Sequence, residues 1–255
     1  MYPDLFSIGP IHTFGIFVAA SFLLGILITL ELGKAEGIAP PQVIDISLVI
    51  VVSSLIGARL AHVIFNISYY RGHPVEALRI WDGGLVFSGG VFLAIIVTTF
   101  YVRTHNITIW RAGDLWAPAV AFGQGIGWIG CFIVGCGYGK MTYLPWAVVF
   151  KDSRSLAPIL VPLHPTQLYA SLSGFIIFLI VLLIRSKRKF EGQVFLWILI
   201  LDSTAKLLIE RFRGDSRGLL ISGDMTATQL ISLIIMVASV ISLWHLRSSS
   251  CRDKN

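Results

Sequence analysis

The strongest constraint in this sequence is a series of long apolar segments separated by short polar linkers. About seven runs approach the roughly 20 residues that cross the hydrocarbon core of a bilayer as a helix. The expected transmembrane helices are Thr13–Leu32, Val43–Phe65, Leu85–Val102, Gly113–Gly135, Thr166–Ile184, Gln193–Arg211 and Thr226–Leu246. We therefore expect an all-α, polytopic membrane protein, with residues 1–255 forming a single integral membrane domain.

The composition agrees with a lipid environment. Charged residues make up 13% of the chain and hydrophobic residues 55%, whereas soluble domains carry about 25% charged residues. The net charge of +6 is compatible with nucleic-acid binding. However, the cations lie in short linkers beside apolar runs, where they control topology. We expect no nucleic-acid partner.

The distribution of basic residues predicts an orientation. The densest cluster, Arg185–Lys189, lies in a short linker directly between two expected helices. Such clusters favour the cytoplasmic side. With about seven spans, this places the N-terminus outside and the C-terminus inside.

Ionisable residues within the expected spans are candidates for function, because burying charge in lipid is costly. Arg59 lies deep in the second span, and His62 follows one turn later. In the sixth span Asp202, Lys206 and Glu210 are four residues apart, with Arg213 three further on. This one-sided ladder has two interpretations. It is either a self-paired structural strut, or a support that leaves Arg213 over to bind an external anion.

Glycines mark two places of close approach. Gly123 and Gly127 form a small-xxx-small pair, which indicates tight helix packing. The segment 83–90 has paired glycines on either side of a short apolar stretch. This pattern lets the backbone approach another group closely, and a lipid headgroup is one such group.

The cysteines predict neither a disulfide framework nor a metal site. Cys131 and Cys136 are five residues apart, which on a continuous helix places them on different faces. Cys251 lies in a polar tail. No zinc-like spacing occurs, and no nucleotide-binding motif occurs. We expect no metal and no cofactor.

Several short motifs follow one another along almost the whole chain. They are Gly57-Ala58-Arg59-Leu60, Trp81-Asp82-Gly83-Gly84-Leu85, Asp114-Leu115-Trp116-Ala117-Pro118, Gly125-Ile126-Gly127-Trp128-Ile129-Gly130-Cys131-Phe132, His164-Pro165-Thr166-Gln167-Leu168-Tyr169, Glu210-Arg211-Phe212-Arg213 and Thr228-Gln229-Leu230-Ile231-Ser232. In this order the set resembles the prolipoprotein diacylglyceryl transferase family. The resemblance implies a multi-pass protein of the bacterial cytoplasmic (inner) membrane. It also implies transfer of the sn-1,2-diacylglyceryl group from phosphatidylglycerol to the lipobox cysteine of preprolipoprotein signal peptides.

The resemblance also implies a set of site residues. The catalytic candidates are His164 as the base, with His62 as the alternative, Arg213 together with Arg59 for the phosphate, and Glu210. The substrate-binding candidates are Arg59, Gly83, Gly84, Ser88, Gly89, Gly90, Gly127, Trp128, Gly130, Cys131 and Tyr169. The chain departs from the family pattern at three of these, where the family usually has His for Ser88, Arg for Trp128 and Asn for Cys131.

These departures leave two other interpretations open. A non-catalytic or altered-specificity relative would bind phospholipid or lipoprotein precursor without transferring anything. A small-solute transporter would use the buried ladder, although the sequence has no inverted repeat or paired broken helices.

Overall fold

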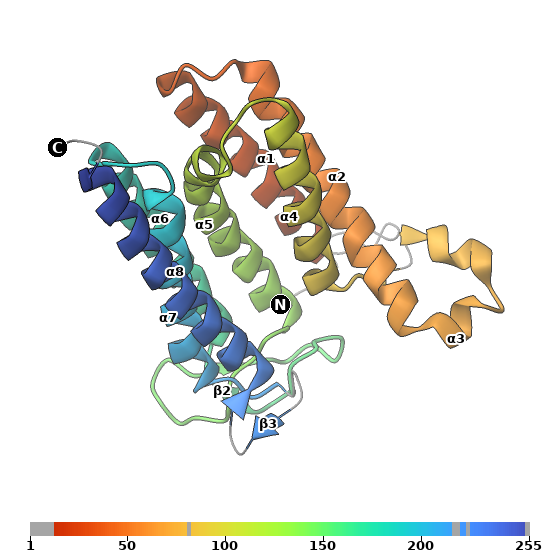
Figure 1. Cartoon of the computed structure of the whole chain (residues 1–255). Coiled ribbons are helices and arrows are strands. Elements are labelled where there is room, and N and C mark those ends of the chain that lie inside the picture. Colours follow the sequence, from red (N-terminus) through yellow and green to blue (C-terminus); the bar gives the residue numbers. More distant parts are fainter. Residues whose placement is uncertain (1–12, 81–82, 216–219, 223–224, 253–255) are drawn as a thin grey trace. The chain divides into compact units, whose positions relative to one another are not determined.

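The computed structural model describes residues 13–80, 83–215, 220–222 and 225–252. Its α-helices are α1 (Thr13–Ala35), α2 (Pro40–Phe65), α3 (Ile67–Tyr70), α4 (Phe87–Thr104), α5 (Ile109–Val134), α6 (Thr166–Ser186), α7 (Gln193–Glu210) and α8 (Ala227–Arg252), with a 3-10 helix η1 at Pro74–Leu78. The strands form two small antiparallel pairs, β1 (Val148–Val149) with β2 (Pro162–Leu163) and β3 (Leu220–Ser222) with β4 (Met225–Thr226) (Figure 1). The expected all-α class is confirmed.

Six of the described helices are long and apolar enough to cross a membrane: α1, α2, α4, α5, α6 and α8. Their outer faces carry exposed apolar side chains, such as Phe92 at 68% and Trp244 at 74%, which lipid can cover. Helix α7 has 18 residues but carries three ionisable ones, Asp202, Lys206 and Glu210. The chain is therefore a multi-pass membrane protein, while the expected seventh span and the orientation of the termini stay predictions.

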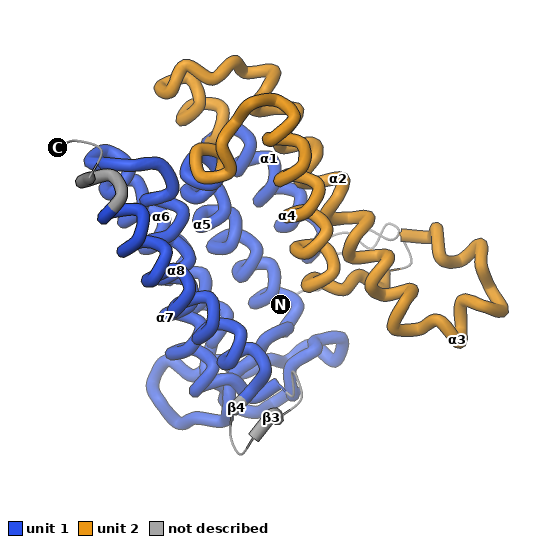
Figure 2. The backbone as a smooth tube through the Cα atoms, viewed as in Figure 1, with its two compact units in different colours: residues 1–28, 113–255 blue, residues 29–112 orange. Residues whose placement is uncertain are grey.

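The chain divides into two compact units (Figure 2). Unit 1 comprises residues 1–28 and 113–255, and unit 2 comprises residues 29–112. The single membrane domain expected over residues 1–255 stays a prediction.

The core of unit 1 lies between α5, α6 and α7. Its buried residues are small or branched: Ala117, Ala121, Ile177, Val181, Val194 and Ile198. Helix α1 joins this unit through glycines of α5. A Cβ on Gly130 would lie 2.7 Å from the Cβ of Phe17, and one on Gly123 would lie 3.7 Å from the Cβ of Ser21. The predicted close packing at the glycine-rich helix is confirmed.

A buried carboxylate connects α5 to the start of α7. Asp114 is completely buried and accepts backbone hydrogen bonds from Gly192 and Phe195, both at 2.8 Å. Its Oδ2 also lies 3.4 Å from Nη1 of Arg188. The first N–H groups of a helix have no intrahelical acceptor, so Asp114 caps α7 from a different helix. Part of the basic cluster 185–189 therefore has a structural role in addition to its predicted control of topology.

Unit 2 depends on close contact between α2 and α4. A Cβ on Gly57 would lie 2.5 Å from the carbonyl oxygen of Gly89, and one on Gly90 would lie 2.7 Å from that of Ser54. Gly89 and Gly90 therefore bring α4 against the backbone of α2. The predicted close approach of the backbone at these two glycines is confirmed, with a helix as the partner, and their predicted part in binding substrate stays a prediction.

This contact yields a stability prediction. The Gly57→Ala methyl group would lie 2.6 Å from the Cβ of Leu93 as well as against Gly89. We expect this overpacking to cost about 1–3 kcal/mol, measured as thermal unfolding in detergent. Gly15→Ala is the matched control because a Cβ there meets nothing within 4 Å. Equal unfolding temperatures for the two variants would contradict the packing described.

Candidate functional site

A short backbone ribbon organises the loop end of unit 1. The segment around Gly139 lies between the segment that contains His164 and the segment that contains Phe212. Gly139 N–H donates to the His164 carbonyl at 3.1 Å. On its other side Lys140 N–H donates to the Phe212 carbonyl at 2.8 Å. A Cβ at Gly139 would lie 2.5 Å from the His164 carbonyl and 2.9 Å from that of Phe212. Glycine therefore allows the segments that carry His164 and Arg213 to flank the same strand-like stretch.

Arg213 is held by two carboxylates. Its Nε and Nη2 donate to the two oxygens of Asp215 at 2.9 and 2.8 Å. Its Nη1 lies 3.7 Å from Glu210 Oε2. Burial lowers the pKa of Arg213, but the hydrogen bonds to Asp215 and the charges of Asp215 and Glu210 outweigh burial and raise the pKa above its ordinary value. The guanidinium is therefore permanently charged.

The predicted charge ladder is only partly formed. Lys206 pairs with Asp202 at 2.7 Å, and Glu210 pairs with Arg213. In the part of the chain that the structure describes, no ion pair joins Lys206 to Glu210. Arg213 has an additional partner, because Asp215 folds back onto it after the end of α7. The Arg-x-Asp spacing in the sequence was the signal for this partner. The interpretation that Arg213 binds an external anion stays a prediction.

Trp128 faces this cation from α5. The guanidinium carbon of Arg213 lies 5.9 Å from the centre of the Trp128 ring, within the range of a cation–π contact. Gly137 has a φ of 66°, and a Cβ there would lie 2.9 Å from the Trp128 ring. The structure thus brings three predicted residues together: Glu210, Arg213 and Trp128.

Glu210 also connects α7 to the start of α8. Its Oε1 accepts a hydrogen bond from the Thr226 hydroxyl at 3.1 Å. Thr226 and Gln229 form reciprocal side-chain and backbone hydrogen bonds of 3.1 and 3.3 Å, the pattern of a capping box. The position of Glu210 is therefore fixed from two helices.

His164 and Tyr169 form a second polar group. The His164 Nδ1 lies 3.2 Å from the Tyr169 hydroxyl, and Trp146 Nε1–H donates to that hydroxyl at 2.8 Å. The His164 ring also packs against Phe212, with centroids 5.2 Å apart. Phe212 directly precedes Arg213 in the chain, so this ring contact brings the His164–Tyr169 pair next to the Arg213 cluster.

Gln167 belongs to one of the motifs but is not among the candidate site residues. Its side chain is completely buried, and its Nε2 donates to the Cys136 carbonyl at 2.9 Å. The neighbouring Thr166 hydroxyl donates to the Gly137 carbonyl at 2.6 Å. The Oε1 atom of Gln167 has no hydrogen-bond partner among the described residues. Gln167 and Thr166 therefore hold the turn that supports Trp128 and Arg213.

Cys131 and Cys136 form a disulfide, which corrects the expectation from sequence. The physical reason is the end of α5. Gly135 adopts a φ of 87°, and Cys136 N–H donates to the Cys131 carbonyl at 3.0 Å. In this Schellman arrangement the residues five apart face each other, and their Cα atoms are 5.0 Å apart. Cys131 is therefore a link to the turn at 135–137, and its expected role in binding substrate stays untested.

Gly127 and Gly130 lie one turn or less from Trp128 on α5. Gly130 packs against Phe17, and a Cβ on Gly127 would lie 3.9 Å from the Ser21 hydroxyl. Both glycines therefore face α1. This placement explains them by packing, and their predicted part in binding substrate stays a prediction.

The other predicted site residues lie in unit 2. Arg59 is 7% exposed and donates to the carbonyl oxygens of Glu76 (2.6 Å), Ala77 (2.9 Å), Gly83 (2.6 Å) and Gly84 (3.3 Å). Gly83 and Gly84 have φ values of 81° and 70°, which glycine adopts without strain. Arg59 thus anchors the segment between α2 and α4.

Ser88 lies exposed in the first turn of α4. Trp81 and Asp82, which belong to one of the motifs, lie outside the described residues. Within the described ranges no group of three or more His, Cys, Asp or Glu side chains could hold a metal ion.

Fold and site define a multi-pass membrane protein with a permanently charged arginine at its loop end. Comparison with known proteins identifies the group. The sequence model described as prolipoprotein diacylglyceryl transferase matches residues 3–245. The chain belongs to the prolipoprotein diacylglyceryl transferase family.

Individual relatives match over most of their length. A phosphatidylglycerol–prolipoprotein diacylglyceryl transferase of Finegoldia magna is 34% identical over 229 residues, covering 89% of this chain and 88% of the relative. Proteins of the same name from Clostridioides difficile (34% over 242 residues, covering 95% and 92%) and Bacillus velezensis (31% over 262 residues, covering 99% and 94%) are also similar.

The disulfide yields a direct chemical prediction. In a Cys251→Ser background, we expect the native protein to take up no maleimide before reduction and two after it, because both remaining thiols are joined. Intact-mass measurement gives the count. Two labels without reduction would contradict the disulfide, and a Cys131→Ser variant in the same background, which has one thiol, is the control.

Proposed function

We propose that this chain transfers the sn-1,2-diacylglyceryl group of phosphatidylglycerol to the lipobox cysteine thiol of a preprolipoprotein signal peptide. A carbon–sulfur bond forms at the glycerol carbon that carries the phosphate, and the carbon–oxygen bond to that phosphate breaks. Glycerol phosphate leaves, and the thiol proton passes to a base. Family membership supports the reaction, and the Arg213 cluster is the observation that carries the assignment of its site.

Arg213 has donors to offer a phosphate. A guanidinium has five N–H groups, and two of them bind Asp215. Because Glu210 lies 3.7 Å from Nη1, beyond normal hydrogen-bond length, roughly three donors remain, on Nη1 and Nη2. A phosphate that gains charge as its carbon–oxygen bond breaks is stabilised by such a fixed cation. We assign this role to Arg213.

His164 suits the proton transfer. If its Nδ1–H donates to the Tyr169 hydroxyl, Nε2 carries the lone pair that accepts the thiol proton. Trp146 fixes the Tyr169 hydroxyl and so fixes the ring that the hydroxyl contacts. This arrangement supports His164 as the base in the absence of the histidine that the family usually has at Ser88.

Trp128 supports a rearranged phosphate site. An arginine at this position, as in the usual family pattern, would bring a second guanidinium close to Arg213. Here the aromatic ring stabilises a single cation. Glu210 and Asp215 then carry two negative charges against the one positive charge of Arg213.

We place the protein in the bacterial cytoplasmic membrane, with the loop end of unit 1 on the outer face. The disulfide supports this side, because thiols in the cytosol are kept reduced. The partners are phosphatidylglycerol, the signal peptides of preprolipoproteins and the bilayer. The reaction needs no cofactor, metal or nucleic acid.

The test is turnover by the purified protein. Phosphatidylglycerol vesicles and a lipobox peptide are mixed with the wild type, and mass spectrometry scores the diacylglyceryl gain while released glycerol phosphate is measured in parallel. We expect both products in equal amounts. No turnover, under conditions in which the Clostridioides difficile relative is active, would favour a non-catalytic relative.

Variants of Arg213 locate the site. We expect Arg213→Ala to lower turnover by about 100- to 1000-fold, the effect of losing one charge-stabilising group. Arg213→Lys restores only part of it, because lysine lacks the planar fork. Arg211→Ala is the matched control, since Arg211 is an exposed cation two residues away. Equal activity of the Arg213→Ala and Arg211→Ala variants would remove the assignment.

A further inference from the structure

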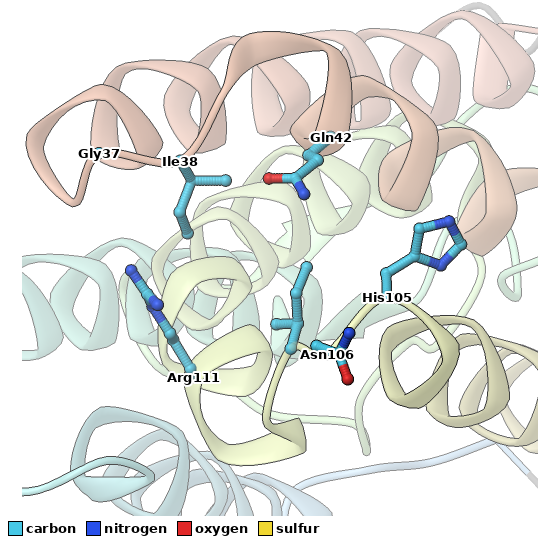
Figure 3. Close-up of a pocket in the computed structure, with 7 residues that line it drawn as sticks. Gly37, Ile38, Gln42, His105, Asn106 and Arg111 are labelled. Carbon is cyan, nitrogen blue, oxygen red and sulfur yellow. The ribbon is translucent and has the colours of Figure 1, made fainter.

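Unit 2 contains a cavity of about 210 Å³ that the transferase reaction does not explain. It lies between the turn joining α1 to α2 and the turn joining α4 to α5 (Figure 3). Its volume is several times the roughly 30 Å³ share of one water molecule. There is thus room for a small polar group.

Two helix endings of the same kind build this cavity. After α1, Gly37 has a φ of 68°, and after α4, Asn106 has a φ of 55°. Ile38 N–H donates to the Gly33 carbonyl at 3.0 Å, and Ile107 N–H donates to the Val102 carbonyl at 2.9 Å. Both are Schellman motifs. They satisfy the final helix carbonyls internally and fix the shape of the cavity.

The polar lining is rich in N–H donors. The side chains of Gln42 and Asn106 are exposed, and Figure 3 shows Gln42 and Arg111 reaching into the gap from opposite sides. Arg111 Nη2 donates to the Glu36 carbonyl at 3.2 Å, and its Nε lies 3.9 Å from Glu36 Oε2. These contacts orient the guanidinium. His105, whose Nδ1 lies 2.8 Å from the Tyr101 carbonyl, completes the rim.

The charge balance favours an anion. The two linkers 33–42 and 103–112 carry Lys34, Arg103 and Arg111 against the carboxylate of Glu36. Lys34 pairs with Glu31 of α1 at 2.7 Å, and Arg111 is the only lysine or arginine among the lining residues. No carboxylate lines the cavity. Helix dipoles do not decide the sign, because α2 and α5 begin here while α1 and α4 end here. The guanidinium of Arg111 therefore supplies the positive charge of the site, beside the carboxylate of Glu36.

The position of the cavity indicates a lipid. Arg59 lies 19 residues along α2 from its first residue, or about 29 Å at 1.5 Å per residue, so the cavity is at the opposite end of this helix from the Arg59 anchor. At the end of membrane-spanning helices it lies at headgroup depth. Exposed apolar side chains run from it along the helices, such as Leu48 at 51% and Phe100 at 71%. The acyl chains of a lipid would contact this apolar surface.

We infer that this cavity binds the phosphodiester headgroup of an anionic phospholipid, with Arg111, Asn106 and Gln42 as donors to the phosphate. Basic pockets beside membrane helices bind such headgroups. The inference goes beyond the proposed reaction and does not depend on turnover. The same donors would accept free phosphate, so the test must separate the two sources.

Lipid retention tests the inference. All variants carry Arg213→Ala, which removes the proposed donor site. Each protein is released from nanodiscs that contain phosphatidylglycerol and phosphatidylcholine, and native mass spectrometry counts the lipid that stays bound. We expect Arg111→Gln and Asn106→Gly each to weaken phosphatidylglycerol binding by about tenfold or more. Glycine tolerates the backbone of Asn106, so the second variant keeps the turn. Arg103→Gln, an exposed cation in the same linker, should bind as the background does.

Three results would overturn the inference. Unchanged retention in both the Arg111→Gln and Asn106→Gly proteins would remove the site. Equal retention of phosphatidylcholine and phosphatidylglycerol would remove its preference for anions. Displacement of the lipid by millimolar inorganic phosphate would show that the site takes free phosphate.

Discussion

The last carbonyl groups of a helix have no intrahelical partner, so the turn that follows the helix must supply hydrogen bonds or leave these groups to water. Helices α1, α4 and α5 solve this in the same way, with one left-handed residue at Gly37, Asn106 and Gly135. Each turn folds the chain back onto its helix within three residues. One such ending places Cys136 against Cys131, and the other two enclose the cavity of unit 2. The unusual features of this protein therefore lie where its helices stop.

The buried charges are stabilised in three different ways. Asp114 is neutralised mainly by backbone N–H groups, and Arg59 by backbone carbonyls. Arg213 is bound by a carboxylate that occupies only one edge of its guanidinium. Arg59 makes four hydrogen bonds with its roughly five donors, whereas Arg213 uses only two of its donors, both to Asp215. This difference favours Arg213 over Arg59 as the phosphate-binding residue.

The apolar runs were enough to predict the helices, because the bilayer imposes their length. The packing role of Gly123 was also predictable from its spacing. The conformation of the turns that follow the helices was not predictable. Treating Cys131 and Cys136 as parts of one helix missed the disulfide, since the decisive event is the φ of Gly135. The partner of Arg213 was missed because Asp215 lies beyond the expected span, where helical spacing no longer applies. The burial of Gln167 was not predictable, because it depends on the turn at 136–137, which is distant in sequence.

The central claim is that Arg213 binds the phosphate, held in place but not saturated by Asp215. Binding of glycerol phosphate to the detergent-purified protein, measured by isothermal titration, tests this most directly. An Arg111→Gln background excludes the cavity of unit 2 from the signal. The Arg213→Gln substitution should weaken glycerol phosphate binding by about tenfold or more. The Asp215→Asn substitution frees donors of Arg213 and should leave the affinity for glycerol phosphate at least as high. Equal affinity with and without the Arg213 guanidinium would contradict the account.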